Sequence, residues 1–211
     1  MTISNIGTKG KNYFGVTNCH VASITDESAM TYGDILSLLG VTAISADSQS
    51  SNDFNYADDD VWSREDKDNG FDGTLSVRDD GSDVATRTFF AEACGYKVLP
   101  NGNVERVSGA DPKPFAFGCE EEGSGGGRRR WYYKCYLGKP AVSQETTTNE
   151  RNGRVMEYPF KAVPVMMPTQ GERSDGRTAY YGDDNYDTFL QSVPFDDAGA
   201  ASSNNAANQG E

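Results

Sequence analysis

The sequence has little histidine and cysteine, and the spacings that bind zinc are missing. There is one histidine, and the cysteines are scattered at positions 19, 94, 119 and 135. None of them forms a Cys-x-x-Cys motif or a histidine pair. We therefore expect no thiolate-bound metal and four reduced, mostly buried thiols.

The chain also lacks a long apolar segment. No stretch approaches the roughly 20 apolar residues of a membrane helix. The first residues, MTISNIGTKGKNYFG, contain no apolar signal core. We expect no membrane association and a mature chain that starts at or near Met1.

Acidic residues outnumber basic residues in this sequence. The 211 residues include 19 Lys and Arg against 32 Asp and Glu, a formal net charge of −13. Such a chain repels phosphates, which argues against sequence-independent binding of DNA or anionic lipid. The length suits one domain with a long excursion and allows a substantial core.

Catalytic signatures are weak. Cys19 and His20 are neighbours on an expected strand, so their side chains point to opposite faces and cannot form a nucleophile pair. Lys67 occupies a position in EDKDNG where a calcium-binding EF-hand needs an oxygen ligand. A pair of carboxylates for glycoside hydrolysis stays open, because that pair is defined by spacing in the fold. None of these patterns predicts a cofactor-binding site.

The clearest periodicity is two, which is typical of antiparallel β-structure with one solvated face. In 70–78, Phe71, Gly73, Leu75 and Val77 share a face. A second run, 156–162, has its apolar face at alternate positions: Met156, Tyr158, Phe160 and Ala162. Two prolines, Pro159 and Pro164, predict an edge position or a bulge for that strand.

One helix is expected at about 83–94, in SDVATRTFFAEACG. Ser82 or Asp83 is a suitable N-cap, and Gly95 is a common residue just past a helix. The predicted apolar face comprises Val84, Ala85, Phe89, Ala91 and Cys94.

Two polar segments flank these elements. Residues about 49–69 form a long acidic connection that we expect to be a loop, either functional or disordered. The last residues, 196–211, have the composition of disorder. We divide the chain into a β-domain, 1–168, and a C-terminal extension or arm, 169–211.

The stretch CEEEGSGGGRRRWYYKC, 119–135, combines glycines, arginines and aromatics. Arg128 stands where the last glycine of a dinucleotide-binding loop belongs, and no Gly-Lys-Ser/Thr of a phosphate loop follows. A β-hairpin with the loop Gly123–Gly127 fits better. In this register the opposed pairs are Glu122 with Arg128, Glu121 with Arg129, Glu120 with Arg130, and Cys119 with Trp131.

This register places Phe115, Phe117 and Cys119 on one face with Trp131, Tyr133, Cys135 and Leu137. The other face is then charged and wet, and three opposite-charge pairs disfavour a slipped register. A nucleic-acid strip at RRRWYYK is the alternative. The adjacent EEE neutralises most of its charge.

The order of segments resembles a known family. It runs FGVTNCHVASITDES, TYGDILSLLGVTAISAD, an acidic loop, NGFDGTLSVRD, a helix, KPFAFGCEEE, RRRWYYKCYLGKPAVSQETTTNE and VMEYPFKAVPV. Over about residues 12–166 this layout is similar to the major tail tube proteins of long-tailed, non-contractile bacteriophages. The segment after Pro168 matches nothing in that layout.

The resemblance implies an antiparallel β-sandwich or small barrel with one flanking helix. It implies a structural virion protein without catalysis, whose six copies form a ring and whose rings stack into a hollow tail tube. The expected partners are further copies of itself and the tape measure, tail terminator and distal tail proteins. DNA would pass through the acidic channel without specific binding, and the protein would be made in the host bacterial cytoplasm.

The acidic segment supplies a candidate ring–ring interface: Asp58, Asp59, Asp60, Val61 and Trp62. Tryptophan is favoured at interface hot spots. The alternative is that Trp62 folds back on its own subunit. Similarly, 196–211 is either an inter-subunit arm or a surface extension.

Another function class stays open. A surface-binding β-module, carbohydrate-binding or capsid-decorating, would stack ligand on aromatics such as Tyr132, Tyr136 and Trp62. It would be a soluble monomer or small oligomer, whereas a tube subunit assembles.

Overall fold

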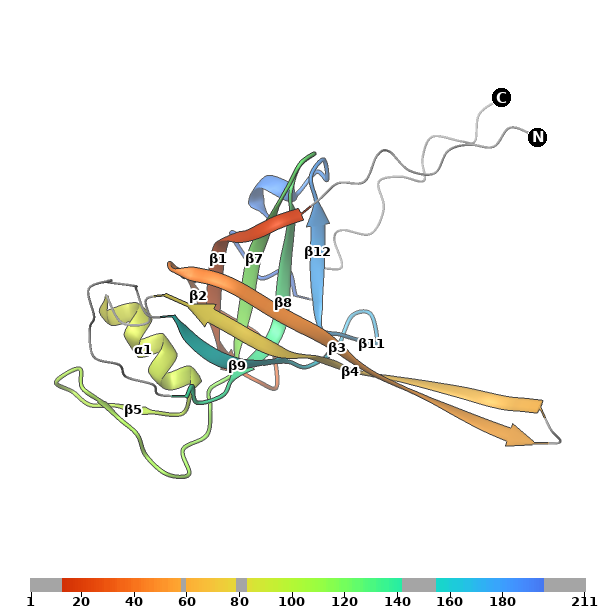
Figure 1. Ribbon diagram of the computed structural model, residues 1–211, viewed down its shortest axis with the longest axis horizontal. Coiled ribbons are helices and arrows are strands. Elements are labelled where there is room, and N and C mark those ends of the chain that lie inside the picture. The colour runs from red at the N-terminus through yellow and green to blue at the C-terminus, as the bar shows by residue number, and fades with distance from the viewer. Residues whose placement is uncertain (1–12, 58–59, 79–82, 142–154, 196–211) are drawn as a thin grey trace, which may run out of the picture.

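The structure is a computed structural model that describes residues 13–57, 60–78, 83–141 and 155–195. These residues are mainly β, with one α-helix (Figure 1). Seven strands form an antiparallel sheet in the order β2-β1-β7-β8-β9-β4-β3, and β12 pairs with β8. The bounds are β1 Tyr13–Asp26, β2 Thr31–Ser37, β3 Val41–Ala57, β4 Asp60–Val77, β7 Phe115–Gly123, β8 Arg128–Leu137, β9 Met156–Ala162 and β12 Gly176–Tyr180.

Smaller elements complete the fold. They are the helix α1 Val84–Ala93, the ribbon of β5 Lys97–Val98 with β6 Val104–Glu105, the ribbon of β10 Val165–Met167 with β11 Glu172–Ser174, and the 3-10 helix η1 Tyr186–Thr188. The predicted fold class, an antiparallel β-structure with one flanking helix, is confirmed. The sheet does not close on itself, so of the two expected forms the fold fits a β-sandwich and not a small barrel.

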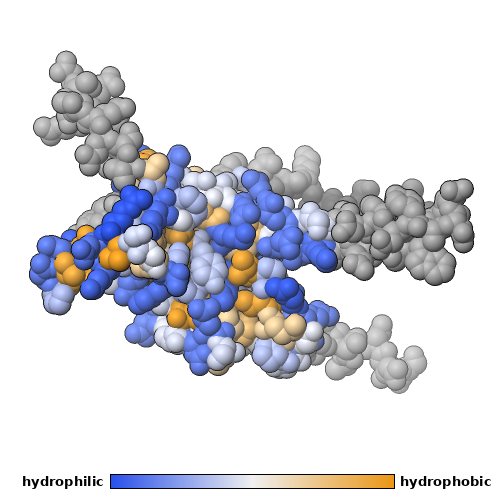
Figure 2. Space-filling view, turned by 90° about the horizontal axis from the view of Figure 1, so that it is seen from below, coloured by the Kyte–Doolittle hydropathy of each residue, from blue (hydrophilic) through white to orange (hydrophobic). Residues whose placement is uncertain are grey.

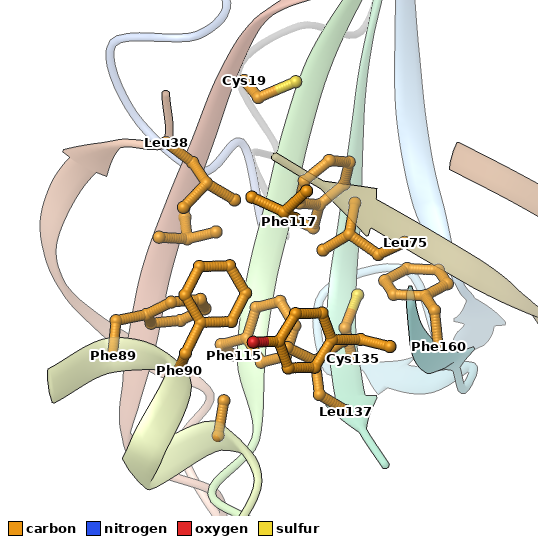
Figure 3. Packing of buried hydrophobic residues seen from close by; sticks show 14 of the residues in the cluster. Cys19, Leu38, Leu75, Phe89, Phe90, Phe115, Phe117, Cys135, Leu137 and Phe160 are labelled. Atoms are coloured by element: carbon orange, nitrogen blue, oxygen red, sulfur yellow. The ribbon is translucent and has the colours of Figure 1, made fainter. Parts of the chain in front are cut away.

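The main core lies on the inner face of the curled sheet (Figure 3). Leu75 and Val77 of β4 are fully buried there, as the alternation in 70–78 predicts. The alternating apolar residues of β9 also point inward, with Phe160 packed edge-on against Phe117 at 5.9 Å between ring centroids.

The position of β9 corrects a prediction. It lies between β8 and β4 rather than at an edge of the sheet. Pro159 is tolerated because the ladder with β8 reaches only from Cys135–Ala162 to Leu137–Phe160. Beyond that last pair, the amide of Gly138 donates to the Pro159 carbonyl at 2.7 Å, so the missing N–H faces the end of β8.

Helix α1 begins and ends where the sequence predicts. The Asp83 carboxylate accepts from the amides of Ala85 at 2.7 Å and Thr86 at 3.1 Å. Its predicted face needs correction, because Val84 is exposed and Phe90 is buried. Phe90 stacks on Tyr158 of β9 at 4.8 Å between ring centroids, which fixes the rotation of the helix on the core.

The outer face of β7 and β8 is buried as well. We call 176–195 the strap: it pairs with β8 through β12 and then packs over this face, where it forms a second cluster with Trp131. A third cluster joins Tyr133 to Val165 and Met167. The boundary predicted at residue 168 therefore falls inside the β-domain, since 169–195 completes its sheet and covers its outer face.

The acidic connection at about 49–69 is not a loop. Both of its halves are strands of a continuous hairpin, paired from Val41–Val77 to Ala57–Asp60. Side chains at 48–51 and 67–69 are exposed on both faces. No apolar alternation marks these strands, which is why periodicity did not predict them.

Candidate assembly surfaces

The outer part of the β3–β4 hairpin projects from the body on the side away from α1 (Figure 1). We call residues 49–57 and 60–69 the projecting ribbon. β4 pairs with β9 only from Phe71 onward, so the ribbon's two strands have only each other as ladder partners among the described residues. The sequence 49–69 contains seven acidic and two basic residues. The ribbon is thus an acidic, two-stranded projection.

The predicted ring–ring residues lie at the end of this ribbon. Asp58 and Asp59 lie outside the described residues. The strand β4 begins with Asp60, Val61 and Trp62, directly after the hairpin turn. Asp60 pairs with Ala57, and Val61 pairs with Tyr56. Their backbone is thereby placed at the outermost end of the hairpin.

The β7–β8 hairpin forms, but its register differs by one residue from the prediction. Glu121 is opposite Arg128, Glu120 is opposite Arg129, and Cys119 is opposite Arg130. The turn is one residue longer than the predicted five-residue loop, so Glu122 has no opposite arginine. This one-residue shift turns each β8 arginine to the opposite face of the sheet from the predicted one.

A bulge also changes the faces further along β8. Phe117 is opposite Tyr132 but Phe115 is opposite Cys135, so β8 has one extra residue between these pairs. Tyr132 and Cys135 therefore both face the inner core, and Trp131 and Tyr133 face outward under the strap. The predicted wet face is in fact a second buried face.

Glu120 and Arg129 form the most connected ion pair. Arg129 Nε donates to Glu120 Oε2 at 3.0 Å, and Tyr186 Oη donates to Glu120 Oε1 at 2.9 Å. Asn18 Nδ2 is a third donor at 3.3 Å. Burial acts to raise the pKa of Glu120, but these hydrogen bonds and the Arg129 charge outweigh it and hold the pKa below its ordinary value.

Arg128 pairs with Glu121 instead of the predicted Glu122. Its guanidinium lies 2.7 Å from Glu121 Oε2 and 4.7 Å from the centroid of the Tyr13 ring. The hydrogen bond to Glu121 raises the pKa of Arg128. This pair joins the start of β1 to the β7–β8 hairpin.

Arg130 pairs with an acid that the sequence analysis did not consider. Its Nη2 lies 3.7 Å from Asp175 Oδ2, and its guanidinium lies over the rings of Phe71 and Tyr132 at 4.8 and 4.5 Å. Burial, opposed by Arg130 and reinforced by Asp68, raises the pKa of Asp175. The Nε atom of Arg130 is buried without a hydrogen-bond partner among the described residues.

Three alternate residues of β8 fasten the strap. Each donates a side-chain hydrogen bond to a strap carbonyl. The pairs are Arg129 Nη1 to Tyr186 O at 2.5 Å, Trp131 Nε1 to Phe189 O at 2.9 Å, and Tyr133 Oη to Pro194 O at 3.0 Å. The spacing of two residues on β8 matches the extended course of the strap.

An opening remains where the sheet fails to close, between the start of β1 and the start of β3. It has a volume of about 400 Å³. Tyr13, Val16, Ala43 and Ile44 are among its walls, and Glu121, Arg128, Arg130 and Tyr132 form its charged and aromatic floor. We call it the β1–β3 opening.

The remaining candidate sites are ordinary structure. The described residues contain no group of three or more metal-ligating side chains. The four cysteines are buried and none of them is in a disulfide, as predicted, and burial raises the pKa of Cys19 to about 12. His20 Nε2 lies 3.0 Å from Asn18 Oδ1 on the strand.

Of the three aromatics proposed for ligand stacking, Tyr132 is covered. Tyr132 is only 6 % exposed and lies beneath Arg130, and Tyr136 is half-buried beside Lys134. The side chain of Trp62 lies outside the description. On the face shown in Figure 2, apolar residues form small patches separated by hydrophilic ones.

Two features escaped the sequence analysis. The strap has no strong periodicity, although its YDTFL segment, 186–190, contributes Tyr186, Phe189 and Leu190 to the core at helical spacing. The β1–β3 opening depends on where the sheet ends, which no local pattern encodes.

Neither the family models nor the curated proteins contain a match to this chain. Within the part of the chain that the structure describes, no helix is long and apolar enough to cross a membrane.

Proposed function

We propose that this chain is a structural subunit that self-assembles into stacked hexameric rings and forms the tail tube of a long-tailed, non-contractile bacteriophage. The observation that supports it best is the projecting ribbon. The layout of the sequence, which resembles the major tail tube proteins, supplies the specific form of the assembly.

The ribbon needs a partner for physical reasons. The part of β3 in the ribbon, 49–57, has nine residues, which at roughly 3.3 Å per residue is about 30 Å of strand. A two-stranded hairpin by itself is marginally stable in water. Contact with a second copy would stabilise it, and its length suits a contact with an adjacent ring.

The charge fits a duct for DNA. A chain of net charge −13, repeated around a channel, repels phosphates and lets a genome slide without binding. In this proposal the subunits contact each other and the tape measure, tail terminator and distal tail proteins, in the virion tail.

Shortening the ribbon tests the proposal. We expect replacement of residues 52–66 by Asn-Gly, which closes the hairpin after the Ser51–Lys67 pair, to leave the monomer folded and to abolish rings and tubes. Negative-stain electron microscopy over a concentration series measures assembly, and thermal unfolding monitored by circular dichroism measures folding.

Val104→Ala provides the control, because Val104 is an exposed apolar residue on the separate β5–β6 ribbon. We expect it to assemble like the natural chain. Failure of the natural chain to form rings or tubes at any concentration would contradict the proposal, as would normal tubes from the shortened chain.

A further inference from the structure

The β1–β3 opening has an excess of positive charge in an acidic protein. Arg128 and Arg130 line it together with one carboxylate, Glu121. The chain as a whole has a net charge of −13. The opening therefore attracts an acidic partner, whereas the whole chain repels one.

The two guanidinium groups in the opening have N–H donors to spare. Each group has about five donors. Arg128 directs its Nε and Nη2 atoms to Glu121, at 2.9 and 2.7 Å, and Nη2 of Arg130 lies 3.7 Å from Asp175. Both side chains remain partly accessible, with 35 % of Arg128 and 25 % of Arg130 exposed. Further carboxylate oxygens can therefore bind here without displacing Glu121 or Asp175.

The shape of the opening suits side chains rather than an additional strand. Its volume is about 400 Å³, and β1 and β3 already lie in contact, so no further strand fits between them. Val16, Ile44 and Ala46 line its walls. Such partly apolar surroundings strengthen an ion pair relative to open water. The opening thus fits a short turn that presents carboxylates.

The outer end of the projecting ribbon has the matching charge. Three consecutive aspartates, Asp58–Asp60, follow Ala57, the last residue of β3. Asp60 begins β4 opposite Ala57, so this run of aspartates spans the turn of the hairpin. The other run of three acids, 120–122, is in β7, where Glu120 and Glu121 already pair with arginines. By charge, the end of the ribbon is therefore the segment that suits the opening.

The ribbon that enters the opening must come from a second copy. β3 itself runs from the opening, which Ala46 lines, to Ala57 at the outer end of the ribbon. This distance is about 35 Å of extended strand at roughly 3.3 Å per residue, and the ribbon points away from the body (Figure 1). A chain cannot return the end of its ribbon to an opening that the same strand lines.

We propose that the β1–β3 opening of one copy binds the aspartates at the ribbon end, Asp58–Asp60, of a second copy through Arg128 and Arg130. The inference rests on the proposed self-assembly and names the surface that accepts the ribbon. The contact is heterologous, because the ribbon and the opening are different surfaces, and such contacts repeat from copy to copy. Ion pairs inside the opening are partly buried, so salt screens them less than it screens exposed charges.

Two substitutions of Ala43 with opposite charge test the site. Ala43 is exposed and lines the opening. We expect Ala43→Glu to lower the fraction of protein in rings and tubes at least tenfold, because the new carboxylate repels the aspartates. Ala43→Lys is the matched control and should assemble like the natural chain. Sedimentation and negative-stain electron microscopy measure assembly, and circular dichroism checks that both variants fold.

A charge exchange identifies the ribbon end as the occupant. We expect replacement of Asp58–Asp60 by three lysines to cause the same loss of assembly. In a chain that also has Ala43→Glu, the exchanged charges attract each other and assembly should return. The control for net charge is a chain with Glu105→Lys, Asp111→Lys and Asp184→Lys, three exposed acids on other elements, which should still assemble.

Disulfide cross-linking between copies locates the contact directly. An Ala43→Cys chain is mixed with an Asp59→Cys chain and oxidised by molecular oxygen with a copper catalyst. We expect a cross-linked dimer on a non-reducing gel that neither chain forms alone. Ala29→Cys, at an exposed alanine in the turn between β1 and β2, should give no such dimer with Asp59→Cys.

Several outcomes would overturn the inference. Equal assembly of the two Ala43 variants, whether normal or lost in both, would reject a charge-dependent contact at the opening. Tubes formed by chains that give no cross-link would leave the proposed function standing with a different contact. Cross-linked dimers without rings or tubes at any concentration would support this contact and reject the tube.

Discussion

At the residue scale, β8 uses its two faces for different purposes. Tyr132 and Cys135 are in the inner core, while Trp131 lies on the outer face and hydrogen-bonds the strap. Arg130 is accommodated on the inner side because Phe71 and Tyr132 contact its guanidinium. A strand with both faces buried leaves little room for side-chain change.

Gly118 provides a sharp test of this packing. A Cβ atom there would lie 2.8 Å from the Trp131 ring, which is fixed by its bond to Phe189. We expect Gly118→Ala to lower the free energy of unfolding by about 1–3 kcal/mol through overpacking, measured by urea denaturation.

Gly33→Ala is the matched control. Its Cβ would meet nothing closer than 3.5 Å on the edge strand β2. We expect a change within about 0.5 kcal/mol. Equal effects of the two substitutions would argue against the packing of Trp131 on Gly118.

Glu120 should make stability depend on pH. Its folded-state pKa lies below the ordinary 4.5, so its stabilisation is present above pH 4.5 and is lost as pH falls through the lower folded value. We expect Glu120→Gln to cost roughly 1–3 kcal/mol at pH 7 and much less below the folded pKa, measured by urea denaturation across pH 7 to 3.

Glu122→Gln controls for the loss of a carboxylate. Glu122 is exposed and lacks an opposite arginine in the observed register. It should change little at either pH, and Asp175, whose pKa is raised, titrates in both variants alike. A pH-independent loss in Glu120→Gln would show that the Glu120 charge is not what matters.

At the element scale, the strap is as much a part of the domain as the strands it covers. It contributes Tyr186, Phe189 and Leu190 to the outer cluster, and all three are buried. Its strand β12 extends the ladder of β8 over Gly176–Tyr132 to Tyr180–Arg128. Removing it would expose an aromatic face of the sheet.

Truncation tests whether the strap is part of the domain or belongs to a separate C-terminal arm. We expect a chain ending at Pro168 to lose cooperative unfolding and to bind the hydrophobic dye ANS, because Trp131 and Tyr133 lose their cover. Circular dichroism melts and dye fluorescence measure this. A chain ending at Phe195 keeps the cover and should unfold like the natural chain, whereas cooperative unfolding of the shorter chain would reject this role of the strap.

At the scale of the whole molecule, charge opposes association. Copies that each have a net charge of −13 repel one another, and salt screens exposed charges with a Debye length that falls from about 30 Å at 0.01 M to about 3 Å at 1 M. Assembly should therefore depend on ionic strength.

We expect the yield of rings and tubes to rise as NaCl increases from roughly 0.02 to 0.5 M, where the Debye length shortens severalfold. Sedimentation at fixed protein concentration measures the yield. Sucrose at matched viscosity is the control. A yield that falls with salt would mean that ion pairs between copies outweigh the net repulsion.

The local elements follow from the amino-acid sequence alone. Alternation in 70–78 and 156–162 predicted two core strands correctly, and Asp83 and Gly95 marked the ends of α1. These signals are local, because the cap residues and the apolar period belong to the element that they define.

The hairpin register, the ribbon and the strap depend on long-range packing. Charge pairing allowed Glu121 to face either Arg128 or Arg129, and burial of both faces of β8 favoured the former. The ribbon's polar strands have no apolar period to show them, and the strap depends on a distant aromatic face that needs cover. Each of the three is stabilised by contacts between residues far apart in the sequence, which local patterns do not encode.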